Sequence, residues 1–312
     1  MSDKIYDIII IGAGPAGLTT AIYAARENLS VLVLEKTICG GWLMYIDLIE
    51  NYPGFPQGIK GYELSSKLVE QACRFKAEIL ESSEVKAVVK GDKEITVTSN
   101  KGAYKARALI ITSGTIARKL NIPGEEEFTG KGISYCAICD GPLFKDKDIM
   151  VIGGGNPAVE EALFLTKFAK SVTLVHKRGT LSAAAVLQDE LKKNNKIKVM
   201  LNHDIISVSG EKIVKSAQIK DILTGKTETL ETQGIFIMHA EFKPNTDFLK
   251  GVVALDSRGY IETDYQMKTD APGIFAAGDI RSKNIHQVVI SCGEGAIAAL
   301  FARDYLRKNI HI

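Results

Sequence analysis

Two cysteines separated by two residues, Cys136 and Cys139, are followed directly by Asp140. A CxxC pair can form a reducible disulfide, and nearby charge can lower the pKa of one thiol so that its thiolate attacks another disulfide. The alternative is half of a zinc site, but zinc in proteins takes about four ligands. We interpret the pair as redox-active and predict no metal site, because the remaining cysteines are scattered singly (Cys39, Cys73 and Cys292).

Two segments of the chain match each other as strand, glycine turn, helix and strand. In the first, the apolar run 7–11 precedes a G-x-G-x-x-G turn at 12–17, and the strand 31–34 ends at Glu35. In the second, 148–152 precedes the turn 153–158, and the strand 172–175 ends at His176. Both intervals from the first glycine to the end of the second strand are 23 positions (35 − 12 and 176 − 153). The repeat predicts two dinucleotide-binding units, with helices running to Arg26 and Ala169.

The spacing of the small residues suits a bound pyrophosphate. The first glycine makes the tight turn, the second lets the backbone approach the ligand, and the third position must be small so that helix and strand pack closely. The pyrophosphate then lies at the positive helix N-terminus. These positions are Gly12, Gly14 and Gly17 in the first unit and Gly153, Gly155 and Ala158 in the second.

The end of the second strand distinguishes the two nucleotides. Glu35 can accept hydrogen bonds from ribose hydroxyls and would repel a 2′-phosphate. Its counterpart His176 is followed by Lys177 and Arg178, which would attract such a phosphate. FAD in the first unit and NADPH in the second fits this difference.

The remaining segments are organised around these units. Turn-rich loops at 40–42 and 50–54 are placed to reach along a bound flavin. A strand within 273–277 leads to Gly278 and Asp279, and the helix 287–299 carries small residues on a face that must approach another segment closely (Gly293, Gly295 and Ala296). Further strands are expected at 85–89, 94–98, 104–108 and 108–112.

Length and composition narrow the class of protein. At 312 residues the chain is long enough for about two domains. The net charge of +2 indicates neither a nucleic acid nor an anionic membrane as partner. No apolar stretch approaches the roughly 18 residues of a spanning helix, and the acidic N-terminus runs directly into a strand instead of forming a secretory signal. With an odd number of cysteines, five, a cytoplasmic location is expected.

These motifs follow the order found in the low-molecular-weight thioredoxin reductases, and the chain resembles that family over essentially its whole length. The resemblance implies an α/β fold of two Rossmann-like three-layer dinucleotide-binding domains, the second inserted in the first. The FAD-binding domain would comprise 1–116 and 247–312, and the pyridine-nucleotide domain, 117–246, would carry the CxxC. The matching segments are 12–17, Glu35, 40–41, 50–54, Gly114, 136–140, 153–158, 244–246, 273–279 and 287–289.

The resemblance also implies a mechanism and partners. Cys139 would face the flavin, Cys136 would attack the disulfide of thioredoxin or a thioredoxin-like protein, and Asp140 would protonate the departing thiolate. The enzyme would be a homodimer with non-covalent FAD. Its domains would rotate, because nicotinamide and the CxxC cannot both stack on one flavin face.

The same resemblance assigns the nucleotide-binding positions. The expected FAD-binding residues are Gly12, Gly14, Pro15, Ala16, Gly17, Glu35, Gly41, Asn51, Gly114, Gly278, Asp279, Gln287 and Val288. The expected NADPH-binding residues are Gly153, Gly155, Asn156, Ala158, His176, Lys177 and Arg178.

The chain departs from the family pattern in three places, and the first two leave the electron donor open. Ser182 stands where a further arginine is usual, and Gly179 replaces an acid. His239 and Glu241 occupy a segment where the family has a small glycine-containing turn, and Trp42 replaces a glutamine. The alternatives to NADPH are NADH, ferredoxin or a deazaflavin as donor, or a dithiol oxidase. A redox sensor or scaffold with negligible turnover is a third hypothesis, against which the intact CxxC-Asp counts.

Overall fold

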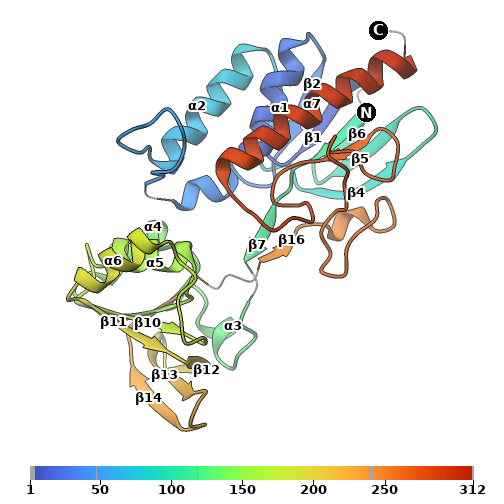
Figure 1. Cartoon of the computed structure of the whole chain (residues 1–312). Coiled ribbons are helices and arrows are strands. Elements are labelled where there is room, and N and C mark those ends of the chain that lie inside the picture. Colours follow the sequence, from blue (N-terminus) through green and yellow to red (C-terminus); the bar gives the residue numbers. More distant parts are fainter. Residues whose placement is uncertain (1–3, 47, 118, 239–241, 311–312) are drawn as a thin grey trace. The chain divides into compact units, whose positions relative to one another are not determined.

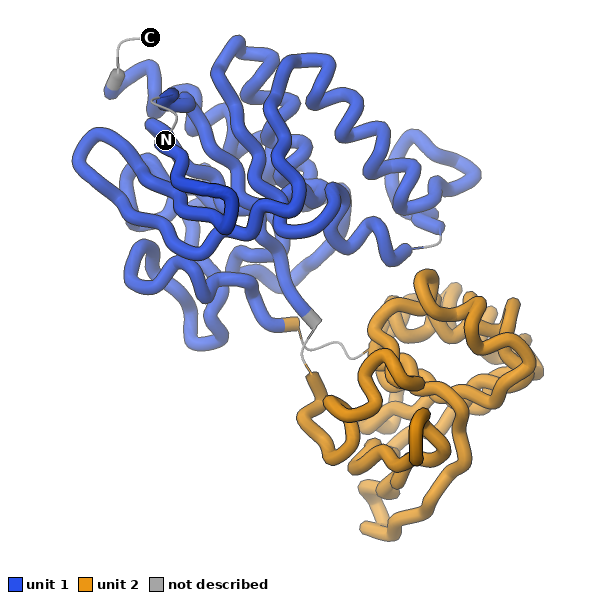
Figure 2. Tube along the Cα trace, turned by 180° about the vertical axis from the view of Figure 1, so that it is seen from behind, with its two compact units in different colours: residues 1–116, 243–312 blue, residues 117–242 orange. Residues whose placement is uncertain are grey.

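The computed structural model describes residues 4–46, 48–117, 119–238 and 242–310. The chain divides into two compact units, unit 1 formed by residues 1–116 and 243–312 and unit 2 by residues 117–242 (Figure 2). Unit 2 is therefore inserted in unit 1. The expected second boundary, after residue 246, falls four residues beyond this division (246 − 242). The chain crosses between the units at β7 (Thr115–Ala117) and β16 (Phe242–Pro244), which pair as a two-stranded sheet.

Unit 1 is built on a seven-stranded sheet in the order β3-β2-β1-β6-β5-β4, with β17 beside β6 (Figure 1). The strands β3, β2, β1, β6 and β17 are parallel, whereas β4, β5 and β6 pair antiparallel. The bounds are β1 (Ile5–Ile11), β2 (Val31–Leu34), β3 (Glu78–Leu80), β4 (Val85–Lys90), β5 (Ile95–Ser99), β6 (Gly102–Ile111) and β17 (Ile274–Ala276).

The central strand β1 contributes to two cores. Ile8 and Ile10 lie in the core beneath the helices, while Ile9 and Ile11 lie in a second core with residues of β4 and β5. Because β1 is buried on both faces, its sequence is a run of β-branched residues and does not alternate between apolar and polar residues. The helices of unit 1 are α1 (Pro15–Arg26), α2 (Gly61–Arg74) and α7 (Val288–Ile310), with the 3₁₀ helices η1 (Gly41–Tyr45) and η3 (Asp247–Leu249).

Unit 2 is likewise built on a central sheet with a core on each face. Its sheet is parallel and five-stranded, in the order β11-β10-β9-β15-β8. Helices pack on one face, and a three-stranded antiparallel sheet, β12-β13-β14, packs on the other. The sheet strands are β8 (Ile133–Ser134), β9 (Asp148–Ile152), β10 (Ser171–His176), β11 (Ile197–Leu201) and β15 (Gly234–Ile237). The other elements are α3 (Glu125–Phe128), α4 (Ala137–Asp140), η2 (Gly141–Phe144), α5 (Asn156–Leu165), α6 (Ala185–Lys193), β12 (His203–Gly210), β13 (Val214–Asp221) and β14 (Thr227–Glu231).

The predicted α/β class with an inserted second unit is confirmed, but several element bounds differ from expectation. The helix expected to reach Ala169 ends at Leu165, because residues 166–168 bond to carbonyls three positions back and tighten into a turn. The strands expected at 104–108 and 108–112 are one strand, β6. The C-terminal helix starts at Val288 and continues to Ile310, eleven residues beyond the expected end (310 − 299), since no glycine or proline interrupts that segment.

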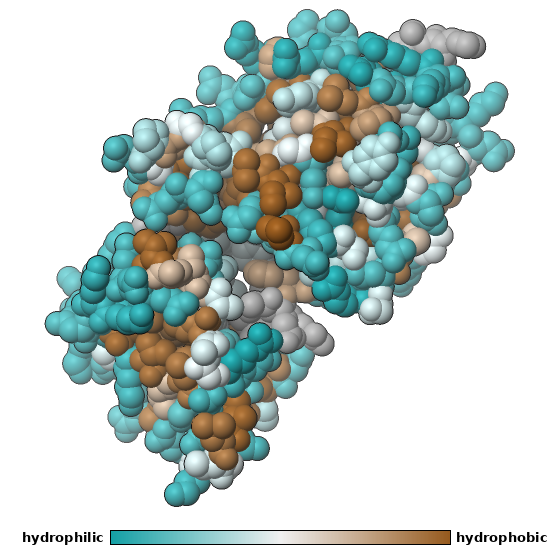
Figure 3. Space-filling model, in the orientation of Figure 1, coloured by the Kyte–Doolittle hydropathy of each residue, from teal (hydrophilic) through white to brown (hydrophobic). Residues whose placement is uncertain are grey.

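The visible surface is mostly polar, with apolar patches on both units (Figure 3). None of the helices in the described part of the chain is long and apolar enough to cross a membrane.

Candidate active site

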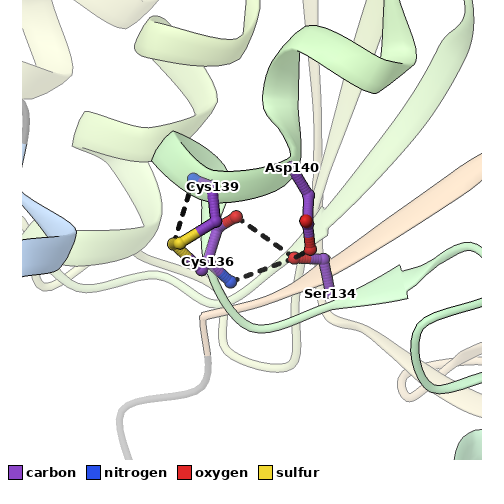
Figure 4. Close-up of a disulfide and its surroundings, with 4 residues drawn as sticks. All are labelled: Ser134, Cys136, Cys139 and Asp140. Atoms are coloured by element: carbon purple, nitrogen blue, oxygen red, sulfur yellow. Dashed lines mark hydrogen bonds between the residues drawn. A yellow bond between two sulfur atoms is a disulfide. The ribbon is translucent and has the colours of Figure 1, made fainter. Parts of the chain in front are cut away.

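The redox turn of unit 2 consists of β8, α4 and the link between them. Cys136 and Cys139 form a disulfide with their Cα atoms 5.3 Å apart (Figure 4). The Cys139 N–H donates a hydrogen bond to Cys136 Sγ over 3.1 Å, so Cys136 caps α4 with its own sulfur. Cys136 is buried and Cys139 is exposed. An amide directed at a sulfur favours its thiolate form after reduction, and here the favoured sulfur is that of Cys136.

Ser134 connects this turn to Asp140. Its hydroxyl donates to Asp140 Oδ2 over 2.6 Å and accepts from the Cys136 N–H over 3.0 Å (Figure 4). The Cys136 carbonyl lies 3.2 Å from the same hydroxyl, which has one proton and favours the shorter contact. Ser134 therefore links the Asp140 carboxyl to the backbone of Cys136. Sequence reasoning missed Ser134, although a serine two residues before the first cysteine was the available signal.

The first glycine turn leaves no room for larger residues at its first and third positions. Gly12 has a φ of 102°, and a Cβ there would lie 2.5 Å from the Thr112 carbonyl oxygen. A Cβ on Gly17 would lie 1.9 Å from the Gly12 carbonyl oxygen. A Cβ on Gly14, in contrast, would meet no described atom within 4 Å. The turn is thus tight toward the sheet and open at its second glycine, the position where a pyrophosphate would approach.

Glu35 lies at the end of β2 beside this turn. Its carboxylate accepts hydrogen bonds from the Ala13 N–H over 2.8 Å and the Thr37 N–H over 2.9 Å. Glu35 and Gly12 line a pocket at this edge of the sheet, together with Ile11, Leu34, Lys36, Ser83, Glu84, Val85, Ser113, Asn245 and Phe248. Gly114 lies nearby, because its carbonyl accepts from the Asn245 N–H over 3.0 Å.

Segments distant in sequence converge on the same turn. A Cβ on Gly41 would lie 3.4 Å from Gly14 Cα, and a Cβ on Gly278 would lie 2.8 Å from Ala16 Cβ. Asn51 donates to the side chain of Gln287 over 3.1 Å, across 236 positions of sequence. The remaining expected residues of this group lie at helix starts: Pro15 opens α1 and Val288 opens α7.

A charge network supports the Gly278–Asp279 segment and was not anticipated from the sequence. Glu294 on α7 accepts from the Gly278 N–H over 2.8 Å and pairs with Arg281 at 2.6 Å and Lys283 at 3.2 Å. The side chains of Glu294, Arg281 and Lys283 are only 11–12% exposed. The alternation of charged residues directly after Asp279 was the signal that could have revealed it.

Asp279 is the further acid of this network. Burial by itself raises the pKa of its carboxyl, but the hydrogen bond from His286 and the charge of Lys283 outweigh burial, so the pKa lies below its usual value. Asp279 therefore remains ionised near neutral pH, in contact with Ser291 at 3.2 Å.

The second glycine turn repeats the geometry of the first. A Cβ on Gly153 would lie 2.3 Å from the Met238 carbonyl oxygen and 2.6 Å from Ala158 Cβ. A Cβ on Gly154 would lie 2.4–2.5 Å from ring atoms of His176, which packs against this glycine. The first position is again restricted to glycine, and Ala158 at the third position is fully buried.

The two turns differ at the second glycine. A Cβ on Gly155 would lie 3.7 Å from Ser182 Oγ, whereas the corresponding space at Gly14 is open. Ser182 is bound to Gly154, since its N–H and hydroxyl donate to the Gly154 carbonyl over 2.8 and 3.3 Å. Asn156 accepts from the Ala184 N–H over 2.7 Å. The loop after β10 is therefore anchored on the second turn.

The cations expected beside this turn follow β10 directly. Lys177 is half-buried and Arg178 is exposed. Trp42, which replaces a glutamine of the family pattern, donates from its indole N–H to the Thr115 carbonyl over 2.9 Å. The segment with His239 and Glu241 lies outside the described residues.

The structure brings together the expected FAD-binding residues in unit 1, whereas the expected NADPH-binding residues share unit 2 with the disulfide. Among the residues with described positions, no three His, Cys, Asp or Glu side chains converge where they could hold a metal ion.

Comparison with known proteins identifies close relatives of the whole chain. The pyridine nucleotide-disulphide oxidoreductase family matches residues 6–295. The thioredoxin reductase of Bacillus subtilis (strain 168) is 42% identical over 307 residues, which cover 98% of this chain and 96% of that protein. The crystal structure of Lactococcus lactis thioredoxin reductase covers 97% of this chain and 99% of its own, with 38% identity and a TM-score of 0.94.

A further solved structure, a ferredoxin-flavin thioredoxin reductase from Clostridium acetobutylicum, is 31% identical. It covers 98% of both chains with a TM-score of 0.54.

Proposed function

Because the chain belongs to the pyridine nucleotide-disulphide oxidoreductases and, within them, to the low-molecular-weight thioredoxin reductases, we propose that it moves electrons from NADPH through FAD and the Cys136–Cys139 pair to thioredoxin. The observation that carries the proposal is the disulfide next to Asp140, in the same unit as the second glycine turn. The third hypothesis, a redox sensor or scaffold with negligible turnover, is disfavoured because relatives over the full length are named as reductases.

The residues of unit 1 fit FAD. Gly14 offers open space at the N-terminus of α1, where backbone amides can bind a pyrophosphate. Glu35 lines the adjoining pocket, where its carboxylate can accept from a ribose. The Gly278–Asp279 segment and the Asn51–Gln287 pair would hold the remainder of the cofactor. Bound FAD would supply two-electron transfer between the nicotinamide and the disulfide.

Three residues would perform the exchange with thioredoxin. Cys139, being exposed, would face the flavin. The Cys136 sulfur would attack the substrate disulfide as a thiolate, supported by the Cys139 N–H. Asp140, held by Ser134, would deliver a proton to the departing substrate sulfur. Because Cys136 is buried in this structure, the proposal requires a movement that exposes its sulfur to the substrate.

Cysteine substitutions test the order of these steps. Cys136→Ser or Cys139→Ser should abolish thioredoxin reduction yet leave flavin reduction by the donor largely intact, because electrons would reach sulfur last. Stopped-flow bleaching of the flavin and a separate thioredoxin assay measure the two steps. Turnover of a protein disulfide by either variant would refute the redox role of the pair.

The donor is tested at the loop after β10. Lys177 and Arg178 offer two cations to a 2′-phosphate, whereas the family pattern has a further arginine at the position of Ser182. The absence of that third charged contact costs about 1.5–3 kcal/mol of binding free energy, or roughly tenfold to a hundredfold in affinity. We expect a raised KM for NADPH and a narrow preference over NADH. Ser182→Arg should lower the KM for NADPH and leave that for NADH nearly unchanged.

A second candidate keeps the disulfide chemistry but takes electrons from ferredoxin. Ser182 favours it, because its side chain binds the Gly154 carbonyl and offers no positive charge. The ferredoxin-flavin thioredoxin reductase of Clostridium acetobutylicum is similar to this chain over its whole length. Anaerobic titration of the flavoprotein with NADPH, NADH and reduced ferredoxin separates the candidates. Bleaching by ferredoxin alone, including after Ser182→Arg, would replace the NADPH proposal.

A further inference from the structure

Two neighbouring residues hold the strand that leads into the redox turn, and the proposed mechanism uses only the first. The side chain of Ser134 binds Asp140, whereas the hydroxyl of Tyr135 donates a hydrogen bond of 2.7 Å to Glu125 Oε1. Tyr135 directly precedes Cys136 in the chain. The residue next to the proposed nucleophile is therefore held by a second acid, which lies on α3.

Glu125 is a buried acid, only 2% exposed, with several hydrogen-bond donors around it. Besides the Tyr135 hydroxyl, its carboxyl accepts from the Leu120 N–H over 2.9 Å and from the Asn121 N–H over 2.6 Å. A buried carboxyl requires such partners, because burial without them is costly. Glu125 thus joins this segment, which follows β7 in the chain, to the start of the redox turn.

The ring of Tyr135 makes a second, apolar attachment. Together with Leu120 and Ile122 it packs against the core between the two sheets of unit 2. Burial and the hydrogen bond to Glu125 raise the pKa of Tyr135, so its hydroxyl keeps its proton at neutral pH and remains a donor. Because the ring contact and the hydrogen bond use different atoms, a substitution can remove the bond and keep the packing.

The Cys136 sulfur is not accessible to a substrate disulfide in this arrangement, since Cys136 is only 8% exposed. The chain up to Ser134 is fixed by the sheet, where β8 pairs with β15. A backbone movement that exposes the sulfur therefore involves the residues after β8. Consecutive Cα atoms lie about 3.8 Å apart, so a displacement of Cys136 also displaces Tyr135.

We propose that the hydrogen bond between Tyr135 and Glu125 is a latch that keeps the Cys136 sulfur buried and that opens when Cys136 attacks its substrate. Tyr135 is then a positioning residue, which acts on the reaction through its neighbour. The inference rests on the proposed attack by Cys136. In the open state water replaces the partner of both groups, so the latch lowers the fraction of open molecules by the net strength of one hydrogen bond.

The rate of alkylation at Cys136 measures this opening. Wild-type and Tyr135→Phe holoenzymes are reduced anaerobically with dithiothreitol until the flavin is also bleached. The reagent breaks the Cys136–Cys139 bond, supplies its electrons and protons, and leaves as a cyclic disulfide. Iodoacetamide is then added in large excess between pH 6 and 10, where a thiolate forms a carbon–sulfur bond and iodide leaves. Peptide mass spectrometry follows the label at each cysteine.

The expected result is specific to one sulfur. Cys136 should be alkylated about threefold to tenfold faster in Tyr135→Phe than in wild type, the factor for loss of one hydrogen bond. The rates at Cys139, which is already exposed, should agree within about twofold. The increase should persist on the plateau at high pH, because a change in thiol pKa alone shifts the profile along the pH axis. Equal Cys136 rates in the two proteins, or an equal rise at both cysteines, would overturn the inference.

Two further variants make the test sharper. Tyr104→Phe, at a half-buried tyrosine of β6 in unit 1, is the matched control and should behave as wild type. In a Glu125→Ala protein the latch is already lost, so adding Tyr135→Phe should not speed alkylation of Cys136 further. A further rise of about threefold or more in that background would refute the latch.

The readout does not require turnover, which separates the latch from the proposed function. Faster alkylation of Cys136 in Tyr135→Phe, combined with a wild type that reduces no thioredoxin, would support the latch and reject the proposed function alone.

Discussion

At the residue scale, the chemistry of the redox turn depends on how a few short side chains hold one another. Ser134 binds both Asp140 and the Cys136 N–H, so one hydroxyl sets the position of the proposed proton donor relative to the disulfide. The resemblance predicted the roles of Cys136, Cys139 and Asp140, but it gave no indication of the residue that orients the acid.

Ser134→Ala should slow dithiol–disulfide exchange about tenfold. Removing the hydroxyl releases the Asp140 carboxyl, and one such hydrogen bond contributes about 1–1.5 kcal/mol. Stopped-flow reduction of thioredoxin measures the exchange, and the flavin content should not change. Ser134→Thr, which keeps a hydroxyl, is the control. An unchanged exchange rate in Ser134→Ala would mean that the Asp140 contact is not functional.

Glu161→Gln should stabilise the protein increasingly as the pH rises. The folded pKa of Glu161, about 8, lies above its unfolded value of 4.5, so the folded state binds this proton more tightly. That contribution is complete below pH 4.5 and is lost as the pH rises through about 8. At about 1.4 kcal/mol per pKa unit, the variant gains up to a few kcal/mol relative to wild type. Urea unfolding at pH 5, 7 and 9 measures the gain, and a gain independent of pH would contradict the assignment.

At the scale of elements, the helix α7 is positioned by close contact with α1. A Cβ on Gly295 would lie 2.3 Å from the Ala16 carbonyl oxygen, whereas a Cβ on Gly293 would meet no described atom within 4 Å. The expectation that small residues let this helix approach another segment is confirmed at Gly295 and wrong at Gly293, which is exposed.

Gly295→Ala should destabilise unit 1 by about 1–3 kcal/mol, because the added methyl group overpacks the α1–α7 contact. Gly293→Ala provides a matched control in the same helix and should be neutral or stabilising by up to about 1 kcal/mol. Thermal unfolding of the two variants without FAD measures the difference. Equal effects at both positions would show that helix propensity, and not packing against α1, determines the change in stability.

Glu294→Ala should weaken FAD retention. The change leaves Arg281 buried without its carboxylate, leaves Lys283 paired with Asp279 alone and frees the Gly278 N–H, and breaking a buried pair costs about 3–5 kcal/mol. Gel filtration followed by the ratio of flavin to protein absorbance measures retention. Glu228→Ala, an exposed acid of unit 2, should retain flavin as the wild type does. Normal flavin binding by a folded Glu294→Ala protein would mean that this charge network does not support FAD binding.

At the scale of the whole molecule, the two units have separate cores. Unit 2 buries one core on each face of its parallel sheet, and both cores consist of residues of that unit alone. The chain enters and leaves it through β7 and β16. Such an inserted unit is expected to fold by itself.

Residues 117–242 produced alone should fold cooperatively, form the Cys136–Cys139 disulfide and bind no flavin. Residues 1–116 joined by a short glycine-rich linker to 243–312 should bind flavin and lack the redox pair. Circular dichroism, a thiol count before and after reduction, and visible absorption test both pieces. Flavin bound to the isolated 117–242 piece would contradict the proposed division of labour.

The sequence by itself determined the parts whose geometry is local. The glycine turns follow from sterics within a few residues: only glycine fits at Gly12, where a side chain would collide with Thr112, and the same pattern recurs at Gly153. The CxxC spacing likewise lets a single turn bring two sulfurs within bonding distance. Because these features occur in a fixed order, the family and the α/β fold could be predicted, and both are confirmed.

Only the tertiary structure decided which distant residues support those parts. Ala137 of α4 packs in one core with residues of α5, and Asn51 meets Gln287 across most of the chain. Glu294 binds the Gly278 N–H because α7 runs back along the glycine segment. None of these pairs has a spacing that a sequence pattern could reveal, since helix packing and sheet register, which arise from burial of the whole core, set the contacts.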